Sequence, residues 1–354
     1  MGAHPVSDHE AEIDAPSAPV WIGLLPWQHD AARAALRHRA RWPHALLLTG
    51  REGIGKRTFA LELARSLLCE DATADGFACG VCASCRYVQA GQHPDLRVVE
   101  PVEIDDDNVA TPSLWITIAH VRALIDWAQL TSHRHVAKVA VIVPAERMNV
   151  AAANALLKTL EEPPPGTYLI LVAHQPGRLA ATVRSRCQWL TAPVPNKAMA
   201  TEWLLGQGVV QPADVLAQAR GAPLIALRLV NADYQSERTV WLDALSAPPT
   251  LDPIELASRI DRAPRDLRKA LLGAAIDWLT VWSADLAAVQ GGGAPFRTRG
   301  DHAAALAALA KTVAPLPLFR YHRSLLQERA QIAHPLQPRL VAEALLFEYQ
   351  KLFG

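Results

Sequence analysis

The sequence predicts an α/β protein in which a domain built on a parallel β-sheet is followed by a region of helices only. Two patterns support this prediction. Between residues 20 and 192, short apolar runs that end at Gly, Pro or polar residues alternate with longer helical segments, as in βαβ units. After Pro193 and Pro195 the strand patterns stop, and segments rich in Ala and Leu continue to the last residue.

Five apolar runs are short and continuously hydrophobic, which is typical of parallel strands covered on both faces. These runs are residues 45–49, 96–100, 139–143, 168–173 and 188–191. Between these runs, helical periodicity predicts helices at residues 56–68, 118–130 and 151–162. In the first of these helices, Phe59, Leu63 and Leu67 form one apolar stripe. The third helix is expected to end before the three prolines at 163–165, because proline cannot continue a helix.

These patterns predict three folded regions and a tail. Residues 21–192 form the α/β domain, residues 193–235 a small helical lid, and residues 236–354 a helical bundle used for oligomerisation. Residues 1–20 are expected to be disordered, because they combine four acidic residues with three prolines.

Composition limits the classes of function. The chain has 354 residues, half of them apolar, and 35 basic residues balance 35 acidic ones, so no global positive field attracts DNA. Apolar runs stop well short of the roughly 20 residues that a membrane span requires, and the first residues lack a basic start followed by an apolar stretch. We therefore expect a cytoplasmic protein with no membrane contact, whose five cysteines are thiols or metal ligands.

A glycine-rich segment, Gly50-Arg-Glu-Gly53-Ile-Gly55-Lys56, follows the first predicted strand and opens a helix, as a phosphate-binding loop does. Glycines let backbone N–H groups turn toward phosphate oxygens, the helix N-terminus adds partial positive charge, and Lys56 reaches the outer phosphates. An ordinary strand-to-helix turn is the alternative interpretation. The spacing and the context favour the nucleotide-binding one.

The groups that hydrolysis needs are missing from this loop and from the later strand. The position after Lys56 should carry a hydroxyl that binds Mg²⁺, but it is Arg57, and Thr58 lies one residue too late on the helix. The strand at 139–143 lacks the acidic pair that would hold the metal and activate water. Glu146 is interpreted as a solvated loop carboxylate, with a role as base as the alternative. We expect no Mg²⁺ and no hydrolysis, and whether nucleotide still binds stays open.

Four of the five cysteines, Cys69, Cys79, Cys82 and Cys85, fall within seventeen residues. Two-residue gaps let thiolates point at one ion, and four sulfurs complete a tetrahedral shell around Zn²⁺ with no position for water. The sequence therefore predicts a structural zinc site that stabilises the segment between the first helix and the second strand. An iron–sulfur cluster or disulfides are the alternatives, and nothing in the sequence supports either.

Several segments taken in order resemble the bacterial clamp-loader family of the AAA+ superfamily, over roughly residues 20 to 230. They are His44-Ala-Leu-Leu-Leu-Thr-Gly50, the four cysteines, Gly91-Gln-His-Pro-Asp95, Asn154-Ala-Leu-Leu-Lys-Thr-Leu-Glu-Glu-Pro163 and Arg184-Ser-Arg-Cys187. The resemblance implies an AAA+ α/β domain with a zinc-binding insertion, a helical lid and an all-α collar.

The resemblance also implies a role for Arg186. In that family the Ser-Arg-Cys arginine is an arginine finger, a planar cation offered to the γ-phosphate of ATP in the adjacent subunit. From the residues alone, the alternative is an arginine paired with a carboxylate at a domain edge. Arg184 is a weaker candidate for the same pocket. The lid segment from Gly221 to Leu227 has apolar residues where the family's motor subunits carry an arginine.

Three functional hypotheses follow. The first is an ATPase-deficient clamp-loader subunit in a hetero-oligomer with motor (gamma/tau) and delta subunits, which reaches the sliding clamp and primer-template DNA through the complex and belongs to a DNA polymerase holoenzyme. The second is an active motor ATPase that uses Thr58 and Glu146. The third is a stand-alone zinc-bearing DNA-binding module, against which the neutral charge balance argues.

Overall fold

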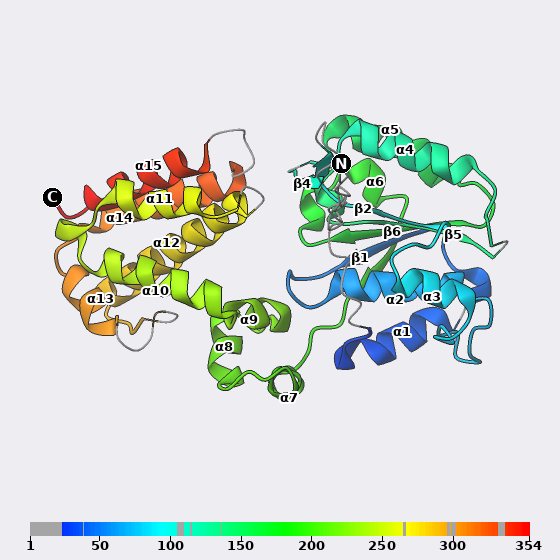
Figure 1. Cartoon of the computed structure of the whole chain (residues 1–354), viewed down its shortest axis with the longest axis horizontal. Coiled ribbons are helices and arrows are strands. Elements are labelled where there is room, and N and C mark those ends of the chain that lie inside the picture. The colour runs from blue at the N-terminus through cyan, green and yellow to red at the C-terminus, as the bar shows by residue number, and fades with distance from the viewer. Residues whose placement is uncertain are drawn as a thin grey trace, which may run out of the picture. The chain divides into compact units, whose positions relative to one another are not determined.

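The computed structural model describes residues 23–37, 39–104, 110–113, 115–134, 136–264, 267–295, 298, 302–331 and 337–354 (Figure 1). The tail predicted at residues 1–20 lies outside the described residues. The chain divides into two compact units. Among the described residues, the first comprises those within 23–51, 55–110 and 115–194, and the second comprises those within 52–54, 111–113 and 195–354.

The first unit is built on a five-stranded parallel sheet with the strand order β2-β5-β6-β1-β7. Its strands are β1 (Ala45–Thr49), β2 (Leu96–Val99), β5 (Lys138–Ile142), β6 (Thr167–Ala173) and β7 (Gln188–Thr191). Two short strands, β3 (Val102–Ile104) and β4 (Ala110–Pro112), pair separately. Because β1, β5 and β6 lie inside the sheet, nearly every residue of these strands is buried.

Helices cover both faces of this sheet (Figure 1). On one face lie α4 and α5, and on the other lie α2, with α1 and α3 beside it. The helices of the unit are α1 (His29–Leu36), α2 (Lys56–Leu68), α3 (Ala83–Gln89), α4 (Ile118–Gln129), α5 (Val150–Glu161) and α6 (Ala181–Arg184). Asn149 caps α5 by accepting a hydrogen bond from the Ala152 N–H, and the helix ends before the proline run as predicted.

The five predicted strands and three predicted helices of this unit are confirmed, with ends that shift by one residue at most. The sequence patterns did not predict α1, α3, α6, β3 or β4. These elements are short, and several of them depend on contacts made elsewhere in the unit rather than on a period of their own.

Among its described residues from 195 to 354, the second unit contains helices and no strand. Its helices are α7 (Lys197–Gly206), α8 (Pro212–Gln218), α9 (Pro223–Leu229), α10 (Ala232–Ser246), α11 (Pro253–Arg262), α12 (Arg268–Gln290), α13 (Ala303–Leu309), α14 (Pro315–Gln331) and α15 (Pro338–Gln350). A small apolar core joins α7, α8 and α9, and a larger one lies among α10 to α15. The two cores are separate clusters of buried side chains.

Helix α12 is the central helix of the larger core. The fully buried Trp282 donates from Nε1 to the Tyr349 hydroxyl at 2.7 Å, and this hydroxyl donates to the Leu245 carbonyl at 2.7 Å. Among the described helices α12 is also the one long and apolar enough to cross a membrane, and 56% of its most apolar window is buried inside the unit. Its hydropathy is therefore that of a core helix in a bundle.

Candidate functional site

The glycine-rich loop joins β1 to α2, as predicted, and Gly55 forms the N-cap of that helix. Gly55 has φ +87°, and a Cβ atom there would lie 2.2 Å from the Leu25 Cδ1 atom. The Gln28 side chain donates from Nε2 to the Gly55 carbonyl at 2.8 Å. Only glycine fits this position, because both the backbone angle and the close packing exclude a side chain.

The amine of Lys56 is turned toward the loop itself. Lys56 is 2% exposed, and its Nζ donates to the carbonyl of Arg51. At the tip of the loop, residues 52–54 group with the second unit, within which the Gly53 carbonyl accepts from the Leu224 N–H at 3.0 Å. The four predicted phosphate-binding residues, Gly50, Gly53, Gly55 and Lys56, thus share one loop, in which the Gly53 and Gly55 carbonyls and the Lys56 amine form hydrogen bonds within the protein.

Arg57, which stands where a magnesium-binding hydroxyl was expected, forms a two-pronged ion pair with Glu100. Its Nε donates to Glu100 Oε1 at 2.8 Å and its Nη2 donates to Glu100 Oε2 at 3.1 Å. Both side chains are about one-third exposed. Glu100 follows directly after β2, so the pair joins the start of α2 to the carboxyl end of an edge strand. The arginine therefore brings a fixed positive charge to this position.

The interpretation of Glu146 as a solvated loop carboxylate is wrong. Glu146 is partly buried after β5, and its Oε1 accepts from the backbone N–H groups of His174 and Gln175, at 2.9 and 3.0 Å. These two residues follow directly after β6, so the carboxylate joins the ends of neighbouring strands. Strand alternation could not show this role, because the residue lies in a turn whose direction the tertiary structure sets.

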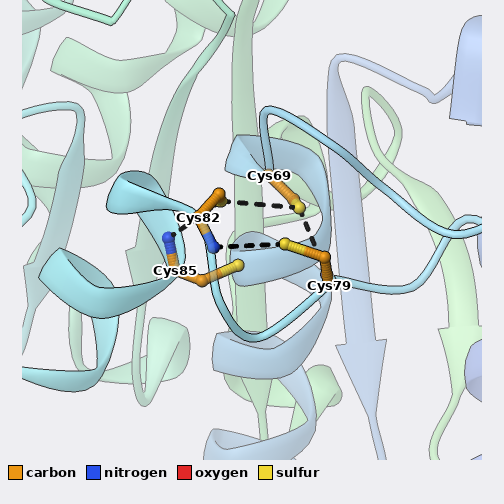
Figure 2. A group of neighbouring side chains, drawn as sticks. All are labelled: Cys69, Cys79, Cys82 and Cys85. Atoms are coloured by element: carbon orange, nitrogen blue, oxygen red, sulfur yellow. Dashed lines mark hydrogen bonds between the residues drawn. The ribbon is translucent and has the colours of Figure 1, made fainter.

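The four clustered cysteines come together between α2 and α3, as predicted (Figure 2). All four sulfur atoms lie within 4.8 Å of one another, and the Sγ atoms of Cys69 and Cys82 are 3.8 Å apart. Four sulfurs at 2.3 Å from a tetrahedral zinc ion would be about 3.8 Å apart. All five cysteines of the chain are free, so the disulfide alternative is not realised, and the cluster can bind a metal ion.

Backbone N–H groups already point at several of these sulfurs. Cys79 N–H donates to Cys69 Sγ at 3.2 Å, Cys82 N–H to Cys79 Sγ at 3.3 Å, and Cys85 N–H to Cys82 Sγ at 3.4 Å. Burial raises the pKa of the Cys69 and Cys85 thiols. Burial also opposes ionisation of Cys82, but hydrogen bonds from the Cys85 backbone and other neighbours outweigh it and bring its pKa to about 7. Such donors stabilise thiolates, the form that binds metal.

A buried network fastens this cysteine module to the sheet. Asp95 N–H donates to His93 Nδ1 at 3.0 Å, so the imidazole proton lies on Nε2, which donates to Ser84 Oγ at 2.6 Å. The Ser84 hydroxyl is then free to donate to the Leu68 carbonyl, at 2.7 Å. Burial lowers the pKa of His93, which agrees with this neutral form. The Gly91 to Asp95 segment stands out in the sequence, but its structural role depends on contacts with Ser84 and the end of α2.

The buried carboxylate of Asp95 supports the segment that leads into β5. It accepts from the N–H groups of His133 and Arg134, both at 2.8 Å, and from the Ser132 hydroxyl at 3.0 Å. Burial alone would raise the pKa of Asp95, but these donors outweigh it and hold the pKa below its ordinary value. Asp95 is therefore a structural carboxylate, and none of its partners belongs to the phosphate loop.

Replacing Asp95 with asparagine should lower the free energy of unfolding by about 1–3 kcal/mol at pH 7, because charge-assisted hydrogen bonds are lost from a buried position. A depressed folded pKa stabilises the fold above the ordinary carboxyl pKa of about 4, and this contribution is lost as the pH falls from there through the folded pKa. Urea unfolding of both proteins should show their difference shrinking below about pH 4. A difference that stays constant down to pH 2 would contradict this role for the ionised carboxylate.

Arg186 lies just after α6, where its guanidinium is one-third exposed. Its Nε donates to Glu161 Oε1 at 2.7 Å, Nη2 donates to the same oxygen, and Nη1 donates to the Thr182 carbonyl at 2.9 Å. In the single chain Arg186 is thus paired with a carboxylate, one of the two arrangements that the sequence left open. Cys187 is the expected buried thiol, and burial raises its pKa to about 11.

The parallel sheet with its covering helices is an α/β fold similar to that of clamp-loader and other AAA+ proteins. A Thermotoga maritima protein described as related to the DNA polymerase III gamma subunit shares this fold, with a TM-score of 0.50 and 15% identity over 92% of this chain and 100% of that one. The family model for the DNA polymerase III delta subunit matches residues 32–195.

Relatives define the family more narrowly. DNA polymerase III subunit delta' of Pseudomonas aeruginosa is 34% identical over 94% of this chain and 98% of its own length. The subunit of the same name from Yersinia pestis is 33% identical over 88% of each chain. The chain therefore belongs to the DNA polymerase III subunit delta' family. A shorter region, 41% of this chain, is 35% identical to a fifth of the Escherichia coli DNA polymerase III subunit tau.

Proposed function

We propose that this protein is an ATPase-deficient subunit of the DNA polymerase III clamp loader, which helps to place the sliding clamp on primed DNA in the cytoplasm. In this proposal it assembles with motor (gamma/tau) and delta subunits and contacts the clamp and the primer-template DNA as part of that complex. Relatives named subunit delta' span most of the chain, which supports this place in the polymerase assembly.

The ion pair between Arg57 and Glu100 supports the proposal that this subunit does not hydrolyse ATP. A guanidinium, which has no oxygen that could bind a metal ion, occupies the position at which a magnesium-binding hydroxyl would stand. Glu146, the acidic residue nearest to the end of β5, uses Oε1 to accept two backbone N–H groups. Arg57 therefore offers no hydroxyl to a magnesium ion, and Glu146 Oε1 is already used to join the ends of β5 and β6.

The purified chain should release no phosphate from ATP with Mg²⁺ above the rate of a buffer control. Its Lys56→Ala variant should give the same rate, because there is no hydrolysis for the lysine to support. Phosphate release can be followed over hours at high protein concentration, with zinc content measured on the same samples. Steady release that disappears in the Lys56→Ala variant would contradict the proposal and favour an active motor.

We propose that the subunit contributes Arg186 to ATP hydrolysis. Its guanidinium would contact the ATP that is bound in the neighbouring motor subunit. The observation that carries this proposal is a partly exposed guanidinium, held at the surface on rigid elements, in a chain whose own phosphate loop lacks the groups for hydrolysis. A cation supplied in trans stabilises the charge that develops on the γ-phosphate. Clamp-dependent ATP turnover by a loader that contains the Arg186→Ala variant is the test.

The remaining parts are proposed to support assembly. Zn²⁺ held by Cys69, Cys79, Cys82 and Cys85 would leave no open coordination position and would stabilise the segment between α2 and β2. The small core of α7 to α9 would form the lid, at residues 193–235, and the larger core of α10 to α15 the oligomerising collar, at residues 236–354. The α/β domain would then be residues 21–192.

A further inference from the structure

The surroundings of Arg186 point to a second residue in the proposed finger. A guanidinium has five N–H donors. Four hydrogen bonds to described residues use four of them: two reach Glu161 Oε1, one reaches the Thr182 carbonyl, and one reaches Ser185 Oγ at a long 3.4 Å. Among these bonds Nη2 takes part only in that to Glu161, so one of its two N–H groups has no described partner.

Glu161 and Thr182 are firmly placed by the core beneath them. Glu161 is the last residue of α5, and its neighbour Leu160 is 1% exposed. Thr182 lies in α6, and its neighbour Val183 is fully buried in the same core cluster. The two groups that hold the guanidinium therefore come from two packed helices, and not from a loop that could move with the side chain.

Helix stability does not explain a carboxylate at this place. The last turn of a helix favours cations, because the helix dipole is negative at its C-terminus. Glu161 thus adds nothing favourable to α5 by its charge, and a half-exposed pair with Arg186 contributes little to folding. The contact of Glu161 with the Nε and Nη2 edge of the guanidinium instead fixes the direction of the long, flexible side chain of Arg186.

We propose that Glu161 is a positioning residue for Arg186. It holds the Nε and Nη2 edge of the guanidinium while a remaining N–H of Nη2 stays available for a phosphate oxygen of the neighbouring subunit's ATP. The finger then meets the nucleotide in a fixed orientation, without first having to order its rotamers. This inference rests on the proposed function, because it gives Arg186 its role in trans.

The test uses the complete clamp loader, reconstituted with motor and delta subunits, sliding clamp and primed DNA, and measures kcat and KM for ATP. Glu161→Gln keeps the shape of the side chain but removes its charge. It should lower the contribution of the neighbouring motor site to kcat about fivefold, the upper range for a partly exposed charge pair, with the KM of that site unchanged. In a loader that already carries Arg186→Ala, the same substitution should have no further effect, because both changes disrupt the same pair of side chains.

Glu162→Gln is the matched control. Glu162 is the next residue, it is exposed, and none of the contacts of the described residues involves its side chain. It should leave kcat as in wild type. Equal losses from both glutamine variants would show a general charge effect and overturn the inference, as would a further loss when Glu161→Gln is added to Arg186→Ala. A slow Arg186→Ala loader beside a normal Glu161→Gln loader would also overturn it while leaving the finger intact. A normal Arg186→Ala loader would instead disprove the finger role in the proposed function.

Discussion

Replacing Arg186 with alanine should slow ATP hydrolysis at the neighbouring motor site by about 10³-fold, the lower range for an arginine supplied in trans. The reason is that the guanidinium is the one group of this subunit proposed to touch the reacting phosphate, and its charge has the largest effect in the transition state. The measurement is a single-turnover rate of phosphate release by the reconstituted loader with clamp and primed DNA. Hydrolysis at the other sites gives the remaining signal.

Two variants make this result specific to a finger. Arg178→Ala removes another exposed arginine from the same unit and should leave the rate unchanged. Arg186→Lys keeps a positive charge but loses the planar fork, so it should restore little of the rate. The fold is not at risk, because a partly exposed ion pair contributes at most about 1 kcal/mol. Wild-type hydrolysis with Arg186→Ala would remove the finger from the proposed function.

The sheet could be predicted from the sequence because its inner strands are buried on both faces. Residues 45–49 and 168–173 read as continuous apolar runs, since every side chain of such a strand meets a helix or the core. Helix α3 could not be predicted in this way. It has seven residues and is N-capped by Cys82, whose sulfur accepts the Cys85 N–H, so its start depends on the geometry of the cysteine cluster.

The candidate site shows the same division between local and distant information. The spacing of the four cysteines was enough to predict that they lie together, and the identity of the residue after Lys56 was enough to show that a hydroxyl is missing there. The partners of the replacing groups were not predictable. Arg57 pairs with a residue 43 positions away, and Glu146 with backbone groups 28 and 29 positions away. Such contacts exist only once the sheet has brought the ends of its strands to one edge.

Arg186 combines both kinds of information. The sequence marks it through the Ser-Arg-Cys segment, and the structure adds a carboxylate 25 positions away that uses two of its donors. The pairing alone would suggest an ordinary surface ion pair. Its location on two packed helices, with an N–H left over among the described contacts, is what makes the pair consistent with a cation prepared for an external phosphate.

Loss of the proposed zinc ion should be the most damaging change to stability in the first unit. Cys85 is fully buried, so Cys85→Ala should abolish the single equivalent of bound zinc and lower the free energy of unfolding by at least about 3 kcal/mol, a fraction of what structural zinc supplies to small domains. The metal's contribution includes the ordering of a module that has few apolar contacts of its own. Metal analysis and urea unfolding on the same samples measure both effects.

Cys187→Ala is the matched control, because Cys187 is also a buried thiol but lies outside the cluster. It should keep one equivalent of zinc and lose only the packing of one sulfur atom, about 1 kcal/mol. A strong chelator should destabilise the wild type and the Cys187→Ala variant alike, and should leave Cys85→Ala unchanged because that protein has no metal to lose. Full zinc occupancy in Cys85→Ala, or a wild type whose unfolding midpoint ignores the chelator, would mean that these four sulfurs do not hold the module together through a metal.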